Sequence, residues 1–391
     1  MRDIWPAFVK FFVSLRLTVV LLALSIVLIF TATLDQVNIG VWGVHEKYFH
    51  AFYVFPTWNG HPVFLFPGGY LIGGLLLLNL LAAHFYRFQL TWKKLGIQLT
   101  HAGVILLLIG ELLSGLWQED YQMSIDTGAT KNYAESYRQY ELAVLETSDP
   151  AVDHVVAIPA ELLTGDGAID TQGRLPFAIR LRGYWSNADL QKRADGAPAP
   201  ASPATVGIGP KIAVVPLPPT TKDNDRNLPA AYVELTGKEG SLGVWLVSPM
   251  LGAPQSFDYA GKTWRLSLRL KRAYYDFSLT LKKFSHDLYP GTDIPKNYSS
   301  LVQLKTNDSA VDRDKLIYMN NPLRYQGLTF YQSSFANNDQ TTILQVVRNP
   351  SWTMPYISCI LVAAGLLFQF TLSLASFATK RSASAKPAAS S

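Results

Sequence analysis

Cysteine is almost absent from this sequence. The 391 residues include one, Cys359, so no disulfide can form within the chain, and neither a C-x-x-C pair for thiol exchange nor a C-x-x-C-H motif for covalent heme attachment occurs. H-E-x-x-H, G-x-S-x-G and Rossmann fingerprints are also missing. We therefore expect no self-contained soluble active site, and any redox chemistry must come from a partner.

Charge is scarce as well, and it is unevenly placed. Charged residues make up 16% of the chain, and the net charge of +5 comes largely from the basic flanks of apolar segments. No basic patch with interleaved aromatic residues follows the pattern of a nucleic-acid surface. We therefore expect no nucleic-acid partner.

Long apolar runs are what the chain has in abundance, because hydrophobic residues make up 49% of it and gather into four segments. Each segment has about the 17 to 25 residues that a transmembrane helix needs. A small-x-small triplet at 31–33 would also fit a signal-peptide cleavage site, but the run is longer than a usual signal-peptide core, so we favour an anchor. The predicted transmembrane helices are residues 17–34, 69–86, 97–117 and 352–377.

Lysine and arginine in the short flanks predict the orientation. They are frequent in the N-terminal flank (1–16), in the second turn (87–96) and in the tail (378–391), whereas the loop 35–68 contains a single lysine. Because basic flanks stay on the cytoplasmic side, both termini should be cytoplasmic. The stretch 118–350 should then be extracytoplasmic.

That stretch, 118–350, is long enough for a hydrophobic core of its own. Hydrophobic and polar residues alternate over 264–270 and again over 277–282, which is the period of a half-buried β-strand. These patterns predict a membrane protein of the α + β class, with a large extracytoplasmic β-sandwich-like domain inserted between helices three and four. Proline-rich stretches within 194–229 have too few large apolar residues for a core, so we interpret them as flexible insertions. Further strands are expected at 175–181, 300–305, 328–333 and 342–347.

The outer loop 35–68 is rich in aromatic residues, particularly over 41–55. Tryptophan and tyrosine favour the membrane interface, so a short helix lying on the outer surface is expected there. His45, His50 and His61 lie in the same loop. They offer metal or heme ligands, although an interfacial or hydrogen-bonding role is commoner for such histidines.

Two further histidines, His84 and His101, flank the turn between helices two and three at equal distances from its centre. In an antiparallel helix pair such positions lie at similar depth, so both imidazoles should sit near the inner face of the membrane. Ionisable groups in membrane helices are costly, and neutral imidazole is a good ligand for iron. We therefore nominate both histidines as metal ligands of a heme-binding site, with Arg87 and Lys94 neutralising the heme carboxylates. The alternative is that the histidines only form hydrogen bonds and the basic residues only determine topology.

The third helix carries Gly96, Gly103 and Gly110 at seven-residue spacing. These glycines fall along one stripe, and small residues allow membrane helices to approach closely. At about 100° per residue, His101 points away from this stripe, so packing and ligand presentation should use different faces. Glu111 in the same helix could be a hydrogen-bond anchor or a contact for a proton or substrate, and we favour the anchor.

Several local sequences, taken in order, are similar to one known family. They are ATLDQVNIG, NLLAAHFYRF, KKLGIQLTHAGVILLLIGELLSG, LPFAIRL, FSLTLKKFSHDLYPGTDIPKNYSSLVQL and GLTFYQSSF. Together with the order of three helices, a β-rich domain and a closing helix, they resemble the ResB/CcsB family of cytochrome c biogenesis proteins. The resemblance covers nearly the whole chain apart from the proline-rich insertions and the tail.

This resemblance implies a role in System II cytochrome c biogenesis in the bacterial cytoplasmic (inner) membrane. Family members act with a CcsA/ResC-type membrane partner. The pair moves heme b outward and attaches it to apocytochrome c, whose cysteines a thioredoxin-like thiol reductant keeps reduced. His84, in NLLAAH, matches the membrane histidine that pairs with one from the partner. His101 is the second candidate, and direct pairing of His84 with His101 is the variant.

The chain lacks one segment that a self-sufficient heme ligase of this family would need. Because no tryptophan-rich WWD-type segment is present, we expect a non-autonomous subunit of a heme-ligating cytochrome c synthase. A membrane-anchored envelope scaffold or adaptor that never binds heme is the alternative, because it explains the same topology. In that case the hairpin histidines would serve only as hydrogen-bonding groups.

Overall fold

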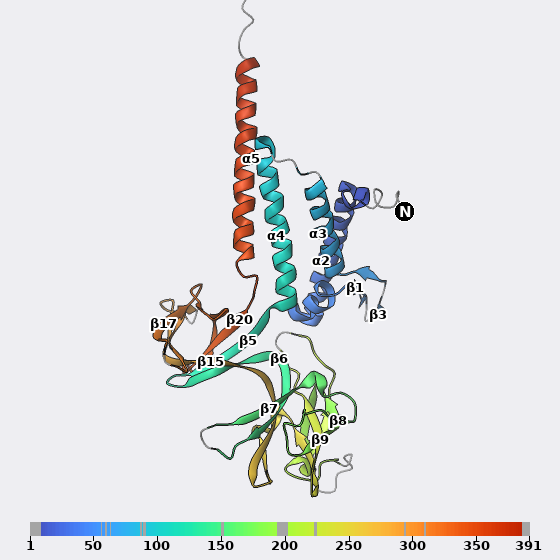
Figure 1. Cartoon of the computed structure of the whole chain (residues 1–391), viewed down its shortest axis with the longest axis vertical. Coiled ribbons are helices and arrows are strands. Elements are labelled where there is room, and N and C mark those ends of the chain that lie inside the picture. Colours follow the sequence, from blue (N-terminus) through green and yellow to red (C-terminus); the bar gives the residue numbers. More distant parts are fainter. Residues whose placement is uncertain are drawn as a thin grey trace, which may run out of the picture. The chain divides into compact units, whose positions relative to one another are not determined.

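The computed structural model describes residues 9–384 except 56, 59–60, 63, 87, 89–90, 150–151, 194–201, 223–224, 293–294 and 309. The chain divides into two compact units, one made of Met1–Glu119 with Asn349–Ser391 and the other of Asp120–Arg348. Figure 1 shows long helices in the first unit and sheets in the second.

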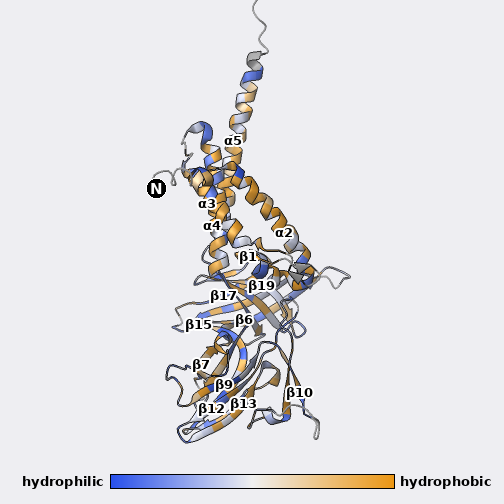
Figure 2. Ribbon diagram, turned by 90° about the vertical axis from the view of Figure 1, so that its right-hand side faces the viewer, coloured by the Kyte–Doolittle hydropathy of each residue, from blue (hydrophilic) through white to orange (hydrophobic). Residues whose placement is uncertain are grey.

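Four helices in the described part of the first unit are long and apolar enough to cross a membrane. Figure 2 shows these helices mainly in the colour of hydrophobic residues, whereas the strands of the second unit have mixed colours. A helix that is apolar on all sides has no face suited to water, which is typical of a membrane span. The helices are α2 (Leu15–Val44), α3 (Gly69–Tyr86), α4 (Leu95–Trp117), which follows the 3₁₀ turn η2 (Trp92–Lys94), and α5 (Met354–Ser384).

The first helix extends beyond its predicted end at residue 34. It continues to Gly40, whose φ of 75° and ψ of 172° are not helical, and a second helical segment runs from there through Val44 into the π-helical turn η1 (His45–Phe49). A distinct helical segment, 41–49, is therefore present within the range 41–55 where a short helix was expected. Short strands follow, namely β1 (Tyr53–Val54), β2 (Thr57–Trp58), β3 (His61–Pro62) and β4 (Phe66–Pro67).

Paired polar groups join the two helical segments on either side of Gly40. Asp35 accepts a hydrogen bond from Tyr48 at 3.1 Å and forms an ion pair with Lys47 at 2.7 Å. The Asp35 side chain is only 12% exposed, and a buried carboxylate is tolerated when it is paired and hydrogen-bonded. Hydropathy alone carries no information about such a pairing, because Asp35 is 12 residues from Lys47 and 13 residues from Tyr48.

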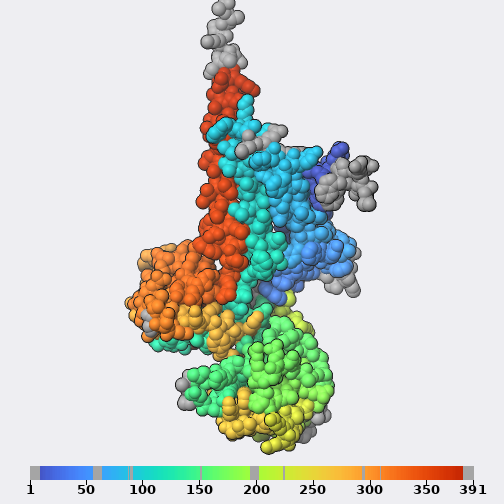
Figure 3. Space-filling view, viewed as in Figure 1, coloured from blue at the N-terminus to red at the C-terminus, as the bar shows by residue number. Residues whose placement is uncertain are grey.

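The predicted glycine stripe is the face on which α4 meets α5, and Figure 3 shows these helices in contact. A Cβ atom on Gly96 would lie 2.6 Å from the carbonyl oxygen of Gly365, and one on Gly103 would lie 2.7 Å from Val362 Cγ2. Gly110 is less constrained, because its nearest neighbour is the side chain of Met354, 3.0 Å from such a Cβ. The closest approach of α4 and α5 is therefore at Gly96 and Gly103, where small residues allow it.

Strands of the second unit form a ten-stranded sheet, a four-stranded sheet and a two-stranded ribbon. The large sheet runs β17-β16-β15-β6-β5-β20-β19-β18, with β14 and β7 attached to β15 and β6, and the smaller one runs β13-β12-β9-β8. The bounds are β5 (Glu119–Asp126), β6 (Thr130–Glu146), β7 (His154–Pro159), β8 (Ala168–Ile169), β9 (Ala178–Trp185), β10 (Ala188–Lys192), β11 (Ile212–Pro216), β12 (Ala230–Gly237), β13 (Gly240–Val247), β14 (Gln255–Tyr259), β15 (Lys262–Leu288), β16 (Pro295–Thr306), β17 (Asp312–Tyr318), β18 (Leu323–Tyr325), β19 (Leu328–Ala336) and β20 (Thr341–Arg348). Three 3₁₀ turns, η3 (Ala160–Leu162), η4 (Gly209–Lys211) and η5 (Pro249–Leu251), complete the unit.

Two strands of unusual length, β6 and β15, join two hydrophobic cores. The strands predicted at 264–270 and 277–282 are parts of the single strand β15, whose pairing with β6 shifts register between Tyr274 and Leu279. One core lies between the four-stranded sheet and the first half of β15, and the other is enclosed by the second half with β5, β16, β19 and β20. The β-rich unit therefore has two hydrophobic cores, whereas a single β-sandwich-like domain was expected. Leu142, Leu181, Val233 and Trp264 belong to the first core, and Met123, Phe277, Phe330 and Leu344 to the second.

Part of the predicted flexible insertion at 194–229 has regular structure. Strand β11 pairs with β10 in register from Ala188 opposite Pro216 to Lys192 opposite Ile212. Ala204 and Ile212 are 5% and 8% exposed and pack in one cluster with Tyr232. Small and branched residues between the prolines are therefore sufficient for a buried face here. Residues 194–201 and 223–224 of the same stretch lie outside the described residues.

Candidate functional site

The structure brings the two hairpin histidines together. The ring centroids of His84 and His101 are 6.4 Å apart, with an angle of 84° between the ring planes. His84 lies in the last turn of α3 and His101 near the start of α4, and the two helices run in opposite directions on either side of the basic turn. The proximity expected from equal distances to the turn is therefore present.

Aromatic rings surround His84. Its ring is 5.5 Å from that of Phe88 and 5.8 Å from that of Phe85, both in edge-to-face arrangements. The Nδ1 atom of His84 is buried and has no hydrogen-bond partner among the described residues. A polar atom buried without a partner costs about 1–3 kcal/mol, so this position favours a ligand that completes it.

The basic residues nominated for the site are placed only in part. Lys94 is exposed in η2, immediately before α4 begins. Arg87 lies outside the described residues. The turn therefore presents positive charge next to the first turns of α4.

The spacing of the imidazoles fits a metal held between them. With metal–nitrogen bonds of about 2 Å, a linear arrangement separates two imidazole centres by about 6 Å. No group of three or more histidine, cysteine, aspartate or glutamate side chains that suits a metal ion occurs within the described residues. The pair therefore suits an ion whose remaining ligands come with it, as those of heme iron do.

A residue that sequence reasoning missed, Asn79, lies in the middle of α3 and is only 3% exposed. Its Nδ2 donates to the carbonyl oxygens of Phe12 at 2.6 Å and Ser14 at 3.3 Å, and its Oδ1 accepts from Thr18 at 2.6 Å. These bonds satisfy backbone groups at the start of α2. The signal in the sequence was the single amide within the apolar run 69–86.

Replacing Asn79 with leucine is expected to lower the stability of the first unit by about 1–2 kcal/mol, because the carbonyls before α2 lose their donor in a medium without water. The thermal unfolding midpoint in detergent measures this. Thr18→Val should lower the midpoint too, and less so when Asn79→Leu is already present. Thr371→Val is the matched control, since within the described residues the Thr371 hydroxyl donates to Leu367 of its own helix. A midpoint unchanged by Asn79→Leu would contradict the prediction.

The histidines of the outer segment have other partners. His50 Nδ1 lies 3.1 Å from Glu46 Oε1, and its ring stacks on Tyr70 at 5.5 Å with an interplanar angle of 8°. His45 lies edge-on to His50 at 5.8 Å. The side chain of His61 is outside the described residues. For His50, hydrogen bonding and stacking account for the side chain without a ligand.

Glu111 does not form the anchor expected from the sequence. It is exposed on α4, and within the part of the chain that the structure describes no hydrogen bond or ion pair involves its carboxylate. His101 is exposed on the same helix. Two ionisable groups on the surface of a membrane helix are costly unless another polar surface covers them.

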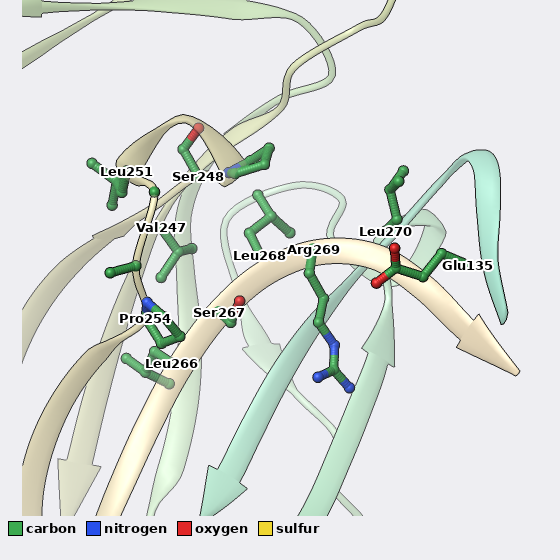
Figure 4. Close-up of a pocket in the computed structure, with 13 residues that line it drawn as sticks. Glu135, Val247, Ser248, Leu251, Pro254, Leu266, Ser267, Leu268, Arg269 and Leu270 are labelled. Atoms are coloured by element: carbon green, nitrogen blue, oxygen red, sulfur yellow. The ribbon is translucent and has the colours of Figure 1, made fainter. Parts of the chain in front are cut away.

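A cavity of about 250 Å³ lies within the second unit, between the η5 turn and β15. Figure 4 shows Arg269 and Glu135 at its wall, and both are paired, Arg269 with Glu141 at 3.0 Å and Glu135 with Arg272 at 2.9 Å. The cavity therefore offers an apolar recess without an unpaired charge among its lining residues, and neither hairpin histidine contributes to it. Its apolar lining includes Val247, Leu251, Pro254, Leu266, Leu268 and Leu270.

Four helices of membrane length and a large β-rich unit define a membrane-associated protein of the α + β class, with two imidazoles paired in a helical hairpin. The ResB-like family profile matches residues 257–343, from β14 to the start of β20. Over 92 residues the chain is 37% identical to Protein NrfI of Wolinella succinogenes, an alignment that covers 24% of this chain. The chain spans only 10% of the length of that curated relative. These matches confirm the resemblance to the ResB family that the local sequences indicated.

Proposed function

We propose that this chain is a ResB/CcsB-like subunit of a System II cytochrome c synthase, which handles heme b across the cytoplasmic membrane and supports its attachment to apocytochrome c. The observation that carries the proposal is the pairing of His84 and His101 at 6.4 Å, with His84 Nδ1 buried and lacking a partner within the described residues. The ResB-like segment at 257–343 supports the pathway, because the family to which it is similar acts in cytochrome c biogenesis.

The chemistry of the hairpin follows from its side chains. His84 would bind the iron of the cargo through a neutral imidazole nitrogen, and the edges of Phe85 and Phe88 would contact the porphyrin. Lys94 and Arg87 would neutralise the propionates at the cytoplasmic side of the membrane. The second axial ligand would be a histidine of the partner or, in the variant arrangement, His101.

Exposed polar groups on α4 support a membrane partner. Glu111 and His101 lie on the helix surface of this chain, and a charged group facing lipid costs about 2.5–3.5 kcal/mol on insertion scales. A CcsA/ResC-type subunit that covers this surface would supply polar contacts to both. Assembly with that subunit is therefore part of the proposal, and ligation would require the pair.

Two further partners are proposed, a thiol reductant and apocytochrome c, and the first follows from the single cysteine of this chain. Its one cysteine, Cys359, is exposed on α5, so it has no dithiol with which to reduce the cysteines of apocytochrome c. A separate thioredoxin-like thiol reductant would provide the electrons. The β-rich unit would lie on the extracytoplasmic side of the bacterial inner membrane, with both termini cytoplasmic, where it would meet apocytochrome c.

Heme content of the purified complex tests this proposal. The full chain, co-expressed with a CcsA/ResC-type partner in heme-replete cells and purified in mild detergent, should show the Soret and α bands of histidine-ligated heme. The same complex from heme-starved cells should lack these bands and regain them when hemin is added. A complex that is heme-free under both conditions would contradict the proposal and favour the non-catalytic envelope scaffold.

A further inference from the structure

One edge of β15 is unpaired between two strands of its sheet. β14 pairs with β15 as far as Leu266, and β16 pairs with it from Phe277 onward. Over 267–274 no strand among the described residues pairs with this edge, whereas β6 pairs with the opposite edge of the same stretch. The sheet therefore has a gap on one side of β15, where backbone N–H and C=O groups have no strand to bond.

A proline explains why β14 ends where it does. In the register of the two strands Gln255 lies opposite Leu266, so Pro254 would be the next residue to pair, opposite Ser267. Proline has no backbone N–H to donate, and it is confined to the ends and edges of strands. Gly252, at the end of η5, has a φ of 73° and turns the chain before β14 begins. The gap is therefore encoded by the local sequence between η5 and β14.

The cavity of about 250 Å³ lies beside this unpaired edge. Its lining includes the consecutive residues 266–270 of β15. Successive side chains of a strand point to opposite faces of the sheet, so a consecutive run lines one cavity only where the cavity adjoins the edge of the strand. Figure 4 shows Val247, Leu251 and Pro254 on the other side of the cavity from β15. The edge of β15 therefore faces open space next to the η5 turn.

The two faces of the sheet beside the gap differ in character. Leu268 is buried in the first core, and Val247 of the same core also lines the cavity. On the opposite face Arg269 forms its ion pair with Glu141. Arg265, on that face too, is exposed and has no ion pair within the described residues. A strand added in the gap would therefore meet an apolar surface on one side and excess positive charge on the other.

These features fit an extended polypeptide better than a small molecule. An extended chain has the alternating N–H and C=O groups that complement a strand edge, and strand addition is a recurring mode of peptide recognition. Pockets for small molecules usually have volumes of about 300–1,000 Å³. The cavity here, at about 250 Å³, is smaller and suits a side chain of an added strand.

We propose that β15 binds an extended segment of a partner polypeptide along residues 267–270. The segment adds as a strand in the gap between β14 and β16. It places an apolar side chain against Leu268 and Val247, and an acidic side chain on the face of Arg265. This proposal goes beyond heme handling, because the site lies in the second unit and uses neither hairpin histidine.

A labelled peptide tests the site on the full chain in detergent. The probe is a blocked peptide of alternating valine and glutamate, about eight residues long, which is a usual strand length. Fluorescence anisotropy should show saturable binding, and hydrogen exchange of the amides within 267–274 should slow when the peptide is added. Methylating the backbone nitrogens along one edge of the peptide should weaken binding at least about tenfold, whereas methylating the other edge should change it much less, because only one edge pairs with β15.

A variant at the cavity wall provides the second test. Ala253→Trp should fill the recess and weaken peptide binding at least about tenfold, because Ala253 is an exposed residue of the lining. Ala157→Trp is the matched control, since Ala157 is an exposed alanine of β7 in the same unit, away from the cavity, and should have no effect. Both variants should keep the unfolding midpoint of the wild-type chain, and the methylated peptides test the same site on the unmodified protein.

The contrary outcomes are distinct. Peptides methylated on either edge that bind as tightly as the parent would exclude strand addition. Slowed exchange at another strand edge, and not within 267–274, would overturn the assignment of the site, as would absence of peptide binding. None of these results bears on the heme content of the partner complex, so this proposal and the proposed function can fail independently.

Discussion

The variant His84→Ala, purified with the CcsA/ResC-type partner, should retain at most about a tenth of the heme of the wild-type complex. His84 combines a buried, unpartnered Nδ1 with two aromatic neighbours, and removal of an axial ligand leaves the iron without its anchor. Added imidazole should restore the α band, because it diffuses into the space that the side chain leaves. Absorption spectra and heme extraction measure both effects.

The companion variant His101→Ala distinguishes two arrangements. If the partner supplies the second ligand, His101→Ala should retain most of the heme, although the ring centroids of the two histidines are only 6.4 Å apart. If the two histidines pair directly, both variants should lose it. His45→Ala is the control, since its ring lies at the other end of the helices beside His50 and should not affect the spectrum. Loss of heme only in His101→Ala would move the ligand site to α4, and full heme content in both variants would show that the hairpin is not the ligand site.

Replacement of Gly96 by valine should separate α4 from α5 and lower the unfolding midpoint of the first unit more than any other substitution described above. The new Cβ would lie 2.6 Å from Gly365 O and 2.9 Å from Gln369 N, and backbone atoms cannot yield as the end of a flexible side chain does. Overpacking typically lowers the free energy of unfolding by about 1–3 kcal/mol. The loss should be large here because the valine side chain would push α5 away from α4.

Gly74→Val provides the matched control for this prediction. It introduces the same side chain into a membrane helix, but a Cβ atom on Gly74 meets nothing within 4 Å. Both variants replace glycine with valine in a helix, so the change in intrinsic helix propensity is the same. The difference between their unfolding midpoints therefore measures the clash alone. Equal midpoints for Gly96→Val and Gly74→Val would show that α4 and α5 can repack without cost.

Several elements followed from the sequence because their causes are local. Apolar runs of membrane length predicted α3, α4 and α5, since composition and length alone decide whether a helix suits lipid. Alternation over 264–270 predicted a strand for the same reason. The approach of His84 to His101 was also predictable, because a short turn between antiparallel helices constrains both positions.

Other features depended on residues far apart in the chain. The contact between the helical segments on either side of Gly40 uses Asp35 with Lys47 and Tyr48, and hydropathy carries no information about that pairing. The continuity of β15 depends on the partner strand β6, which bends with it between the two cores. The proline-rich stretch gained a buried face only because β11 meets β10.

The sequence by itself determined that this is a membrane-associated protein with a large β-rich unit, that it resembles the ResB family, and that two histidines share one hairpin. Those properties arise from composition, periodicity and spacing, which act over short distances along the chain. Only the tertiary structure decided that His84 Nδ1 is buried without a partner in the described residues and that Glu111 is exposed. Whether a polar atom is satisfied depends on which distant groups packing brings to it, and that is settled when the chain folds.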